Sequence, residues 1–288
     1  MRVPAGAFGL GRDEVHVWYV DLDRWAPPGG VRQDGARQGA SCDFWELLSD
    51  DEKARAGRLR SREGSRRFVT GRALLRLLLG AYLEEDAGRE GGHAGGAGDG
   101  SGWVDLRAAR IVERARGLRF EYGPRGKPAL GGDDAGGSAL TFNLSHSHGL
   151  AVYAVARGRQ VGLDVERIRP GIKHELLAVR FFSPREAAAL LAMPDRLRLR
   201  AFYACWTRKE AFIKARGEGF ALSLRRFSVS VDPDRTPVLD DVEGAPGEVL
   251  RWTLCDLEPG PKYAGALAVE GRRWRLRSRR LGSCRLGP

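Results

Sequence analysis

Three acidic residues and one lysine in the second half of the chain have types and spacings that suit phosphate chemistry assisted by a metal. Asp164 and Glu166 are two residues apart in a segment that follows an apolar run over 150–155. Residues two apart on a β-strand point to the same face, so both carboxylates would project together. Glu210 and Lys214 are four residues apart in a segment with the composition of a long helix, which places them one turn apart on one face.

Converging carboxylates are typical ligands of a hard divalent cation. Mg2+ takes oxygen ligands, commonly a few carboxylates, waters and substrate phosphates. Lys214 suits a phosphate better than the metal, because an ammonium attracts anions. Taken alone, Glu210 and Lys214 are better explained as a solvated helical ion pair, which stabilises by only about 0.2–0.5 kcal/mol. The hypothesis of a metal site therefore depends on the strand and the helix meeting in space.

The elements that must hold these residues are predicted by their flanking signals. Residues 150–155 and the segment around Asp164 read as neighbouring strands. Ser183-Pro184-Arg185-Glu186 predicts a helix start, with serine as N-cap, proline at the first position and glutamate at the third. A long helix follows over 196–216, and Gly217 and Gly219 supply its stop.

The first half of the chain offers a similar series of elements. Residues 15–21 read as a strand, and Ser49 with Glu52 forms the pattern of a capping box before an apolar helix over 68–83. Further strands are expected over 118–122, 227–231, 250–255, 263–269 and 273–277. The arginines of the last strand are best explained as the wet face of an edge strand.

Three segments have a composition that does not form a core. Residues 26–41, 86–102 and 131–138 are rich in glycine and polar residues. We expect a surface loop in the first case and a mobile insertion over 86–102. His93 lies alone within that insertion, so we assign it no metal.

The composition limits the class of protein. The chain has 288 residues and 42% hydrophobic content, enough for one large domain or two of ordinary size. Its formal net charge of +11 favours anionic partners, although a general bias towards arginine explains the charge equally well. The four cysteines lie far apart without a CxxC pair, which predicts neither zinc nor disulfides. With no secretory signal and no apolar stretch long enough for a bilayer, we expect a cytoplasmic protein without membrane contact.

Two motifs in this sequence resemble a known family. The segments Gly162-Leu163-Asp164-Val165-Glu166 and Trp206-Thr207-Arg208-Lys209-Glu210-Ala211-Phe212-Ile213-Lys214 are similar to the two signatures of 4'-phosphopantetheinyl transferases, G-x-D-x-E and W-x-x-K-E-A/S-x-x-K. The long, monomeric, surfactin-synthetase-activating type is the most similar. The resemblance also covers residues 48–83, 126–128 and 143–147, and so extends from about residue 45 to the end, except for the glycine-rich loops.

The resemblance implies an activity and roles for the acidic motif. It implies transfer of 4'-phosphopantetheine from coenzyme A to a serine of an apo acyl or peptidyl carrier protein, with release of adenosine 3',5'-bisphosphate. Asp164, Glu166 and Glu210 would be ligands of Mg2+, for which Mn2+ would substitute. Glu210 would also act as catalytic base, and Lys214 would hold the pyrophosphate as a catalytic and coenzyme-binding residue.

The resemblance also implies residues that bind coenzyme A. Ser145 and His146 match the segment that contacts the 3'-phosphate and the adenosine, and Arg55, Arg67 and Lys127 match other phosphate-contacting positions. A structural histidine capping a strand remains an alternative for His146. Asn143 either contacts the ligand or closes a turn. The extra Pro124-Arg125 beside Lys127 departs from the family pattern and leaves the neighbouring contacts open.

The fold implied by the resemblance is an α/β (α+β) structure of two similar halves related by a pseudo-twofold axis, with the active site in the cleft between them. We expect the halves at 1–138 and 139–288, and a monomer whose carrier protein presents an acidic helix. Two alternatives remain open at this stage: a non-catalytic coenzyme A or phosphate binder of the same fold, and a basic nucleic-acid-binding protein. The spread of the arginines along the chain disfavours the latter. Which carriers are served, in fatty-acid, polyketide or non-ribosomal peptide synthesis, is not indicated by the sequence.

Overall fold

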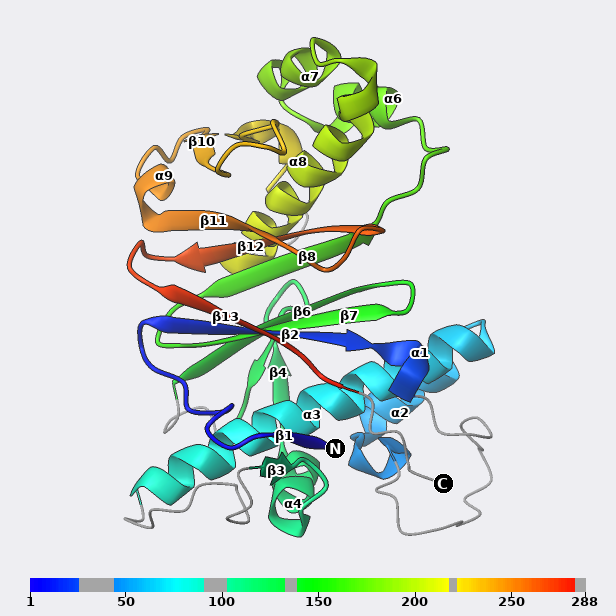
Figure 1. Cartoon of the computed structure of the whole chain (residues 1–288), viewed down its shortest axis with the longest axis vertical. Coiled ribbons are helices and arrows are strands. Elements are labelled where there is room, and N and C mark those ends of the chain that lie inside the picture. Colours follow the sequence, from blue (N-terminus) through cyan, green and yellow to red (C-terminus); the bar gives the residue numbers. More distant parts are fainter. Residues whose placement is uncertain (26–43, 91–102, 133–138, 218–221, 283–288) are drawn as a thin grey trace.

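Two long helices, α3 (Arg62–Glu90) and α8 (Asp195–Arg216), enclose two β-sheets. Figure 1 shows four layers stacked in the order α3, first sheet, second sheet, α8. The predicted α/β class is therefore confirmed. The structure is a computed structural model that describes residues 1–25, 44–90, 103–132, 139–217 and 222–282.

The first sheet has the strand order β13-β2-β7-β6. Its strands are β13 (Arg275–Arg280), β2 (Glu14–Asp21), β7 (Leu150–Arg157) and β6 (Leu140–Ser147). β2 is antiparallel to β7 and parallel to β13, which lies at the edge as predicted. The leucine-rich face of α3 packs on this sheet, in one core with Trp18, Val20 and Tyr153.

The second sheet has the strand order β11-β12-β8, and all its pairs are antiparallel. Its strands are β11 (Trp252–Leu257), β12 (Tyr263–Glu270) and β8 (Val161–Arg167). α8 packs on its outer face, where Phe212, Trp252 and Leu254 share a core. This arrangement places the strand with Asp164 next to the helix with Glu210.

The inner faces of the two sheets form a third core. It contains Val17, Val152, Leu163 and Leu267. Because β7 is covered by α3 on one face and by the second sheet on the other, every residue from Leu150 to Ala156 is buried. A strand buried on both faces is a continuous apolar run rather than an alternating one.

The two halves repeat one topology. In the first, β2 is followed by a capped helix, the long helix α3 and the hairpin β6–β7; in the second, β8 is followed by a capped helix, α8 and the hairpin β11–β12. The sheet orders correspond as well, β2-β7-β6 and β8-β12-β11. The division of domains at residue 138 stays a prediction. In the sheets, the hairpin over 140–157 pairs with the amino-terminal strand β2.

The remaining elements connect these layers. They are β1 (Arg2–Pro4), α1 (Leu22–Trp25), η1 (Phe44–Leu47), α2 (Asp50–Gly57), β3 (Trp103–Asp105), α4 (Ala109–Gly117), β4 (Phe120–Tyr122), β5 (Pro128–Leu130), α6 (His174–Phe181), α7 (Pro184–Leu191), η3 (Leu224–Arg226), β9 (Phe227–Val229), β10 (Leu239–Val242) and α9 (Glu248–Arg251). Among the described helices, none is both long enough and apolar enough to span a bilayer.

The predicted helix boundaries mostly agree with the structure. Both capping boxes are present, at the starts of α2 and α7, and Gly217 ends α8 with a left-handed φ of 71°. The helix predicted over 68–83 is longer, because its polar flanks continue the helical turns of α3. Residues 86–90 of the expected insertion therefore belong to α3. Residues 91–102 with His93, the loop 26–41 and most of 131–138 lie outside the described residues.

Candidate active site

The close contact between β8 and α8 depends on Gly162. A Cβ atom added at this position would lie 2.1 Å from the Ala215 nitrogen and 2.3 Å from the Ala211 carbonyl oxygen. Real Cβ atoms do not approach backbone that closely, so the position requires glycine. The first residue of the acidic motif thus allows the strand to lie against the helix that carries the other charged residues.

Asp164 and Lys214 meet at this contact. The Lys214 Nζ lies 2.6 Å from Asp164 Oδ1 and donates a second hydrogen bond to Ser145 Oγ at 3.1 Å. The Ser145 hydroxyl in turn donates to the same Asp164 oxygen at 3.0 Å. These three residues come from α8, β8 and β6, so the group joins the two halves of the molecule.

The two glutamates of the predicted metal site lie within the electrostatic reach of Asp164. Burial raises the pKa of Glu210, and the charges of Asp164 and Glu166 raise it further, while Lys214 opposes them. Burial also raises the pKa of Glu166, which accepts a hydrogen bond from the Ser147 hydroxyl at 2.9 Å. The charges of the three acids thus act on one another in a partly buried region where Lys214 is a neighbouring cation, and such like charges favour a further cation.

The donor chemistry of this cluster fits a divalent cation. Asp164 Oδ2 is buried without a hydrogen-bond partner, and a buried anionic oxygen without a partner is costly. All the candidate donors are carboxylate oxygens, as Mg2+ prefers. The side chains do not stand in a ligating arrangement, however: among the described residues, no group of three His, Cys, Asp or Glu has the geometry to hold a metal ion. The role of Asp164, Glu166 and Glu210 as metal ligands therefore stays a prediction.

A cleft of about 310 Å³ opens beside this cluster. Five residues predicted to bind coenzyme A line it, namely Arg55, Arg67, Ser145, His146 and Lys214. They come from α2, α3, β6 and α8. The sequence-predicted residues therefore converge from elements that lie far apart in the chain.

The cleft is strongly cationic. Partial removal from water and the charges of Lys214, Arg55, Arg72 and Arg67 lower the pKa of His146, in that order of size. These charges therefore disfavour the protonated imidazole. Such a concentration of positive charge around one side chain favours an anionic ligand.

Arg67 is oriented by an acidic neighbour. Its guanidinium donates two hydrogen bonds to the Asp23 carboxylate, at 2.9 and 2.8 Å, and it also pairs with Glu63. The hydrogen bonds from Arg67 are the main reason that the pKa of Asp23 is lowered. Asp23 thus holds Arg67 in place at the edge of the cleft.

Lys127 does not line the cleft. Its ammonium donates to Gln160 Oε1, to the Val161 carbonyl and to the Ala215 carbonyl, at 3.1, 3.1 and 2.9 Å. Burial lowers its pKa to about 8. These contacts tie the β4–β5 turn to β8 and to the carboxyl end of α8, while its neighbours Gly126 and Pro128 do line the cleft. The phosphate contact predicted for Lys127 stays untested.

The cleft-wall residues that sequence reasoning missed include Phe68, Arg72 and Tyr122. Arg72 is 5% exposed, donates to the Tyr122 hydroxyl at 2.9 Å and has a buried Nη1 atom without a partner. A signal was present, because Phe68 and Arg72 are four residues apart, the spacing of one helical face, and Phe68 directly follows Arg67. Whether these side chains reach the cleft depends on where β4 packs against α3, and no local sequence pattern predicts that packing.

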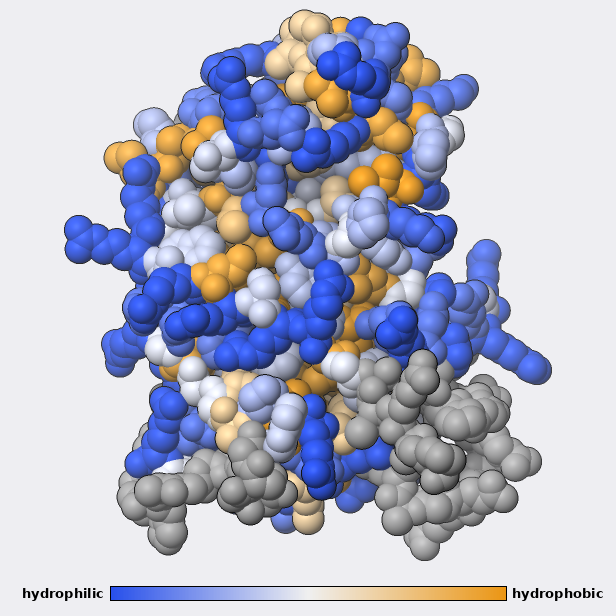
Figure 2. Space-filling view, viewed as in Figure 1, coloured by the Kyte–Doolittle hydropathy of each residue, from blue (hydrophilic) through white to orange (hydrophobic). Residues whose placement is uncertain are grey.

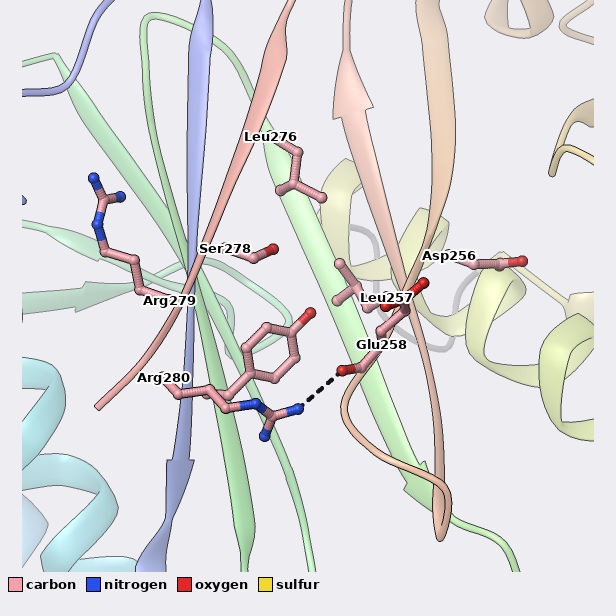
Figure 3. A pocket seen from close by; sticks show the side chains of 8 residues that line it. Asp256, Leu257, Glu258, Leu276, Ser278, Arg279 and Arg280 are labelled. Carbon is pink, nitrogen blue, oxygen red and sulfur yellow. Dashed lines mark hydrogen bonds between the residues drawn. The ribbon is translucent and has the colours of Figure 1, made fainter. Parts of the chain in front are cut away.

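A second cavity, of about 410 Å³, lies where β13 and β2 approach the β11–β12 turn (Figure 3). Figure 3 shows Arg280 reaching the Glu258 carbonyl, to which it donates at 3.1 Å. Asp256 on its wall is paired with Arg208. None of the predicted site residues lines this cavity, so the cleft beside Asp164 is the candidate active site.

Comparisons with known proteins show the family to which the chain belongs. A model of the 4'-phosphopantetheinyl transferase superfamily matches residues 160–268, which include the carboxylate cluster. The 4'-phosphopantetheinyl transferase HetI of Nostoc sp. is 37% identical over 262 residues, which cover 91% of this chain and 90% of HetI. The chain belongs to the 4'-phosphopantetheinyl transferase superfamily, as the resemblance predicted.

Other relatives are less similar or match over a shorter stretch of the chain. A putative 4'-phosphopantetheinyl transferase of Synechocystis sp. is 28% identical, with 84% of this chain and 78% of that protein covered. The 4'-phosphopantetheinyl transferase Sfp of Bacillus subtilis is 38% identical over 118 residues, 41% of this chain and 49% of Sfp. The solved holo-[acyl-carrier-protein] synthase of Thermotoga maritima aligns at 26% identity with a TM-score of 0.32, covering 40% of this chain and 64% of that one.

Proposed function

We propose that this enzyme transfers 4'-phosphopantetheine from coenzyme A to a serine of an apo acyl or peptidyl carrier protein and releases adenosine 3',5'-bisphosphate. One observation carries the proposal: an acidic cluster and Lys214 adjoin a cleft lined by cationic residues. Coenzyme A carries a pyrophosphate and a 3'-phosphate, which match such a cleft in charge. A protein that only bound anions would not need the acidic cluster, which offers carboxylate ligands for a divalent cation.

Arg55, Arg67 and His146 are the proposed contacts for the phosphates of the donor, together with Arg72, which sequence reasoning missed. Arginine presents a planar fork of donors that matches phosphate oxygens. A bound phosphate would also stabilise the protonated form of His146, whose pKa is lowered by burial and by the neighbouring cations. Lys214 is proposed to hold the pyrophosphate, as the flexible point charge nearest to the acidic cluster.

Asp164, Glu166 and Glu210 are the proposed ligands of Mg2+, or of Mn2+ in its place. When bound, such a cation would neutralise charge on the pyrophosphate and orient it. The unpartnered Asp164 oxygen and the raised pKa of both glutamates support this assignment. A bound cation would favour the ionised form of these carboxylates and would give the Asp164 oxygen a partner.

Glu210 is the proposed catalytic base. Burial and two neighbouring carboxylates raise its pKa, which makes it a better proton acceptor than an exposed glutamate. It would accept the proton of the carrier serine, directly or through water, while the serine oxygen bonds to the phosphorus that bears pantetheine. The bond from that phosphorus to the bridging oxygen breaks, and Lys214 is placed to stabilise the negative charge on the leaving bisphosphate.

Mass spectrometry of an apo carrier protein after incubation with enzyme, coenzyme A and Mg2+ tests the reaction. We expect a phosphopantetheine mass increment with the wild type and none with Glu210→Gln, whose circular dichroism should match the wild type. Activity should vanish with a chelator and return with Mg2+ or Mn2+. Wild-type turnover by Glu210→Gln would refute the assignment of Glu210, and transfer under full chelation would refute the metal.

We also propose that the enzyme is a cytoplasmic monomer. The residues of the cleft and of the acidic cluster all come from one chain, so the site needs no second copy. A non-catalytic binder of the same fold is disfavoured because all three carboxylates of the motifs are present. Light scattering coupled to size exclusion would test the monomer at assay concentration.

A further inference from the structure

The seam between the two sheets, where β6 lies beside β8, is held together by hydrogen bonds from β8 amides to β6 side chains. β6 and β8 lie next to each other, yet each is paired through its backbone with one other strand, β7 and β12 respectively. Alternate β6 side chains accept the free amides of β8: Leu163 N–H donates to Asn143 Oδ1 at 2.9 Å, Val165 N–H to Ser145 Oγ at 3.3 Å, and Arg167 N–H to Ser147 Oγ at 3.1 Å. These contacts satisfy strand-edge amides that would otherwise be unpaired.

The two serines of this series make a second contact that the asparagine does not make. Ser145 donates its hydroxyl proton to Asp164 Oδ1 at 3.0 Å, and Ser147 donates to Glu166 Oε2 at 2.9 Å. In both cases the hydroxyl accepts an amide of β8 and donates to the carboxylate of the residue before that amide. The residue at the corresponding place for Asn143 is Gly162, which has no side chain.

The consequence differs between the two carboxylates. Asp164 is also held by Lys214, at 2.6 Å. Among the described residues, the Glu166 carboxylate has no hydrogen-bond partner apart from Ser147. The Ser147 hydroxyl accepts the amide of Arg167 and has a single proton to donate. Of its two described side-chain neighbours, Glu166 Oε2 at 2.9 Å is closer than His148 Nδ1 at 3.4 Å, so we assign this proton to Glu166.

We propose that Ser147 is a positioning residue, which holds the Glu166 carboxylate towards Asp164 so that both can serve one cation. The proposal rests on the proposed function, in which Glu166 is a metal ligand. Hydrogen bonds to metal-ligating side chains fix their orientation, and their loss typically weakens metal binding by about 10–100-fold. The seam of the fold and the geometry of the site would thus depend on the same hydroxyl.

Mn2+ binding to the enzyme without coenzyme A or carrier tests the proposal, with free Mn2+ measured by electron paramagnetic resonance. We expect Ser147→Ala to raise the Kd for Mn2+ by about 10–100-fold. Asn143→Ala is the matched control, because it removes an equivalent contact to β8 without touching a carboxylate. It should lower thermal stability as Ser147→Ala does, with Mn2+ affinity close to that of the wild type. Ser147→Thr keeps the hydroxyl and should restore the affinity.

The outcomes are distinct. Equal Mn2+ affinity of Ser147→Ala and the wild type would overturn the positioning role while leaving the proposed function intact. An equal loss in Asn143→Ala would overturn it too, because the seam as a whole would then set the affinity. A wild type that binds no Mn2+ would instead overturn the metal assignment itself. If Ser147→Ala does not fold, the isosteric pair Ser147→Thr and Ser147→Val provides the same comparison.

Discussion

Lys214 is the residue on which the charge balance of the site depends most. Its ammonium pairs with Asp164, and its charge opposes the rise in the pKa of both Glu166 and Glu210. The same charge helps to lower the pKa of His146 in the cleft. One cation thus links the acidic cluster to the proposed phosphate site, which an ordinary solvated helix pair would not do.

Replacing Gly162 tests whether the contact between β8 and α8 requires glycine at this position of the motif. In Gly162→Ala, the added methyl would meet the backbone of α8, so we expect a loss of about 1–3 kcal/mol in the free energy of unfolding. Urea unfolding measures this loss. The matched control is Gly57→Ala in α2, where a Cβ meets nothing within 4 Å, and where we expect a gain of roughly 0.4–1 kcal/mol. Equal stability of Gly162→Ala and the wild type would contradict the close-contact argument.

At the scale of elements, each half attaches its capped helix to its long helix by a buried ion pair. The capping-box residue Glu52 pairs with Arg76 of α3 at 2.8 Å, and Glu186 of α7 pairs with Lys209 of α8 at 2.6 Å. All four side chains are at most 2% exposed. The glutamate that begins one helix therefore also fixes its position against another, and Lys209 of the signature motif has a structural partner.

Breaking one of these pairs should be costly. Lys209→Met leaves the Glu186 carboxylate buried without its cation, so we expect a loss of about 3–5 kcal/mol in the free energy of unfolding. Arg226→Met is the control, because its pair with Glu243 has both side chains more than half exposed and should contribute less than about 1 kcal/mol. Chemical denaturation compares them. Similar losses in both variants would show that burial does not determine how much an ion pair contributes to the free energy of unfolding.

The contact between β2 and α3 should make stability depend on pH. His16 is 1% exposed, and its Nδ1 lies 2.7 Å from the Tyr82 hydroxyl. Burial lowers its pKa to about 4, with help from Arg279 and Arg277 and against the opposing charge of Glu14. Because the unfolded chain binds the proton more readily, His16 stabilises the fold above pH 6.5, and this stability is lost as the pH falls towards 4.

We expect a loss of roughly 3 kcal/mol across that window, at about 1.4 kcal/mol for each pKa unit. Urea unfolding of the wild type at a series of pH values, compared with His16→Phe, isolates this contribution. The variant removes the titrating ring nitrogen, while Tyr82 still accepts a hydrogen bond from Trp18. Parallel pH curves for the two proteins would show that His16 is not responsible.

At the scale of the whole molecule, basic residues outnumber acidic ones and give the protein a net positive charge. The face in Figure 2 is mostly hydrophilic, with long polar side chains that project into solvent. A net charge of +11 attracts acidic partners over long range. This supports the proposal that the carrier protein presents an acidic helix beside its serine.

Neutralising the acidic residues of that carrier helix should therefore raise the KM for the carrier, with kcat little changed. Charge complementarity acts mainly on association, so added salt should raise the KM of the native carrier in the same direction. The measurement uses saturating coenzyme A, so that only carrier binding varies. An unchanged KM for the neutralised carrier would show that electrostatic docking does not select this partner.

The sequence by itself determined the local features of the fold and the family to which the chain belongs. The capping boxes at Ser49 and Ser183, the stop at Gly217 and the shared faces of the acidic residues follow from short-range rules, because they depend on neighbours a few residues away. The tertiary structure decided what no spacing encodes: that Lys127 faces backbone carbonyls, that Arg72 reaches the cleft wall, and that β6 side chains replace backbone pairing along β8. These contacts join segments 19–88 residues apart, so their geometry exists only once both sheets have packed.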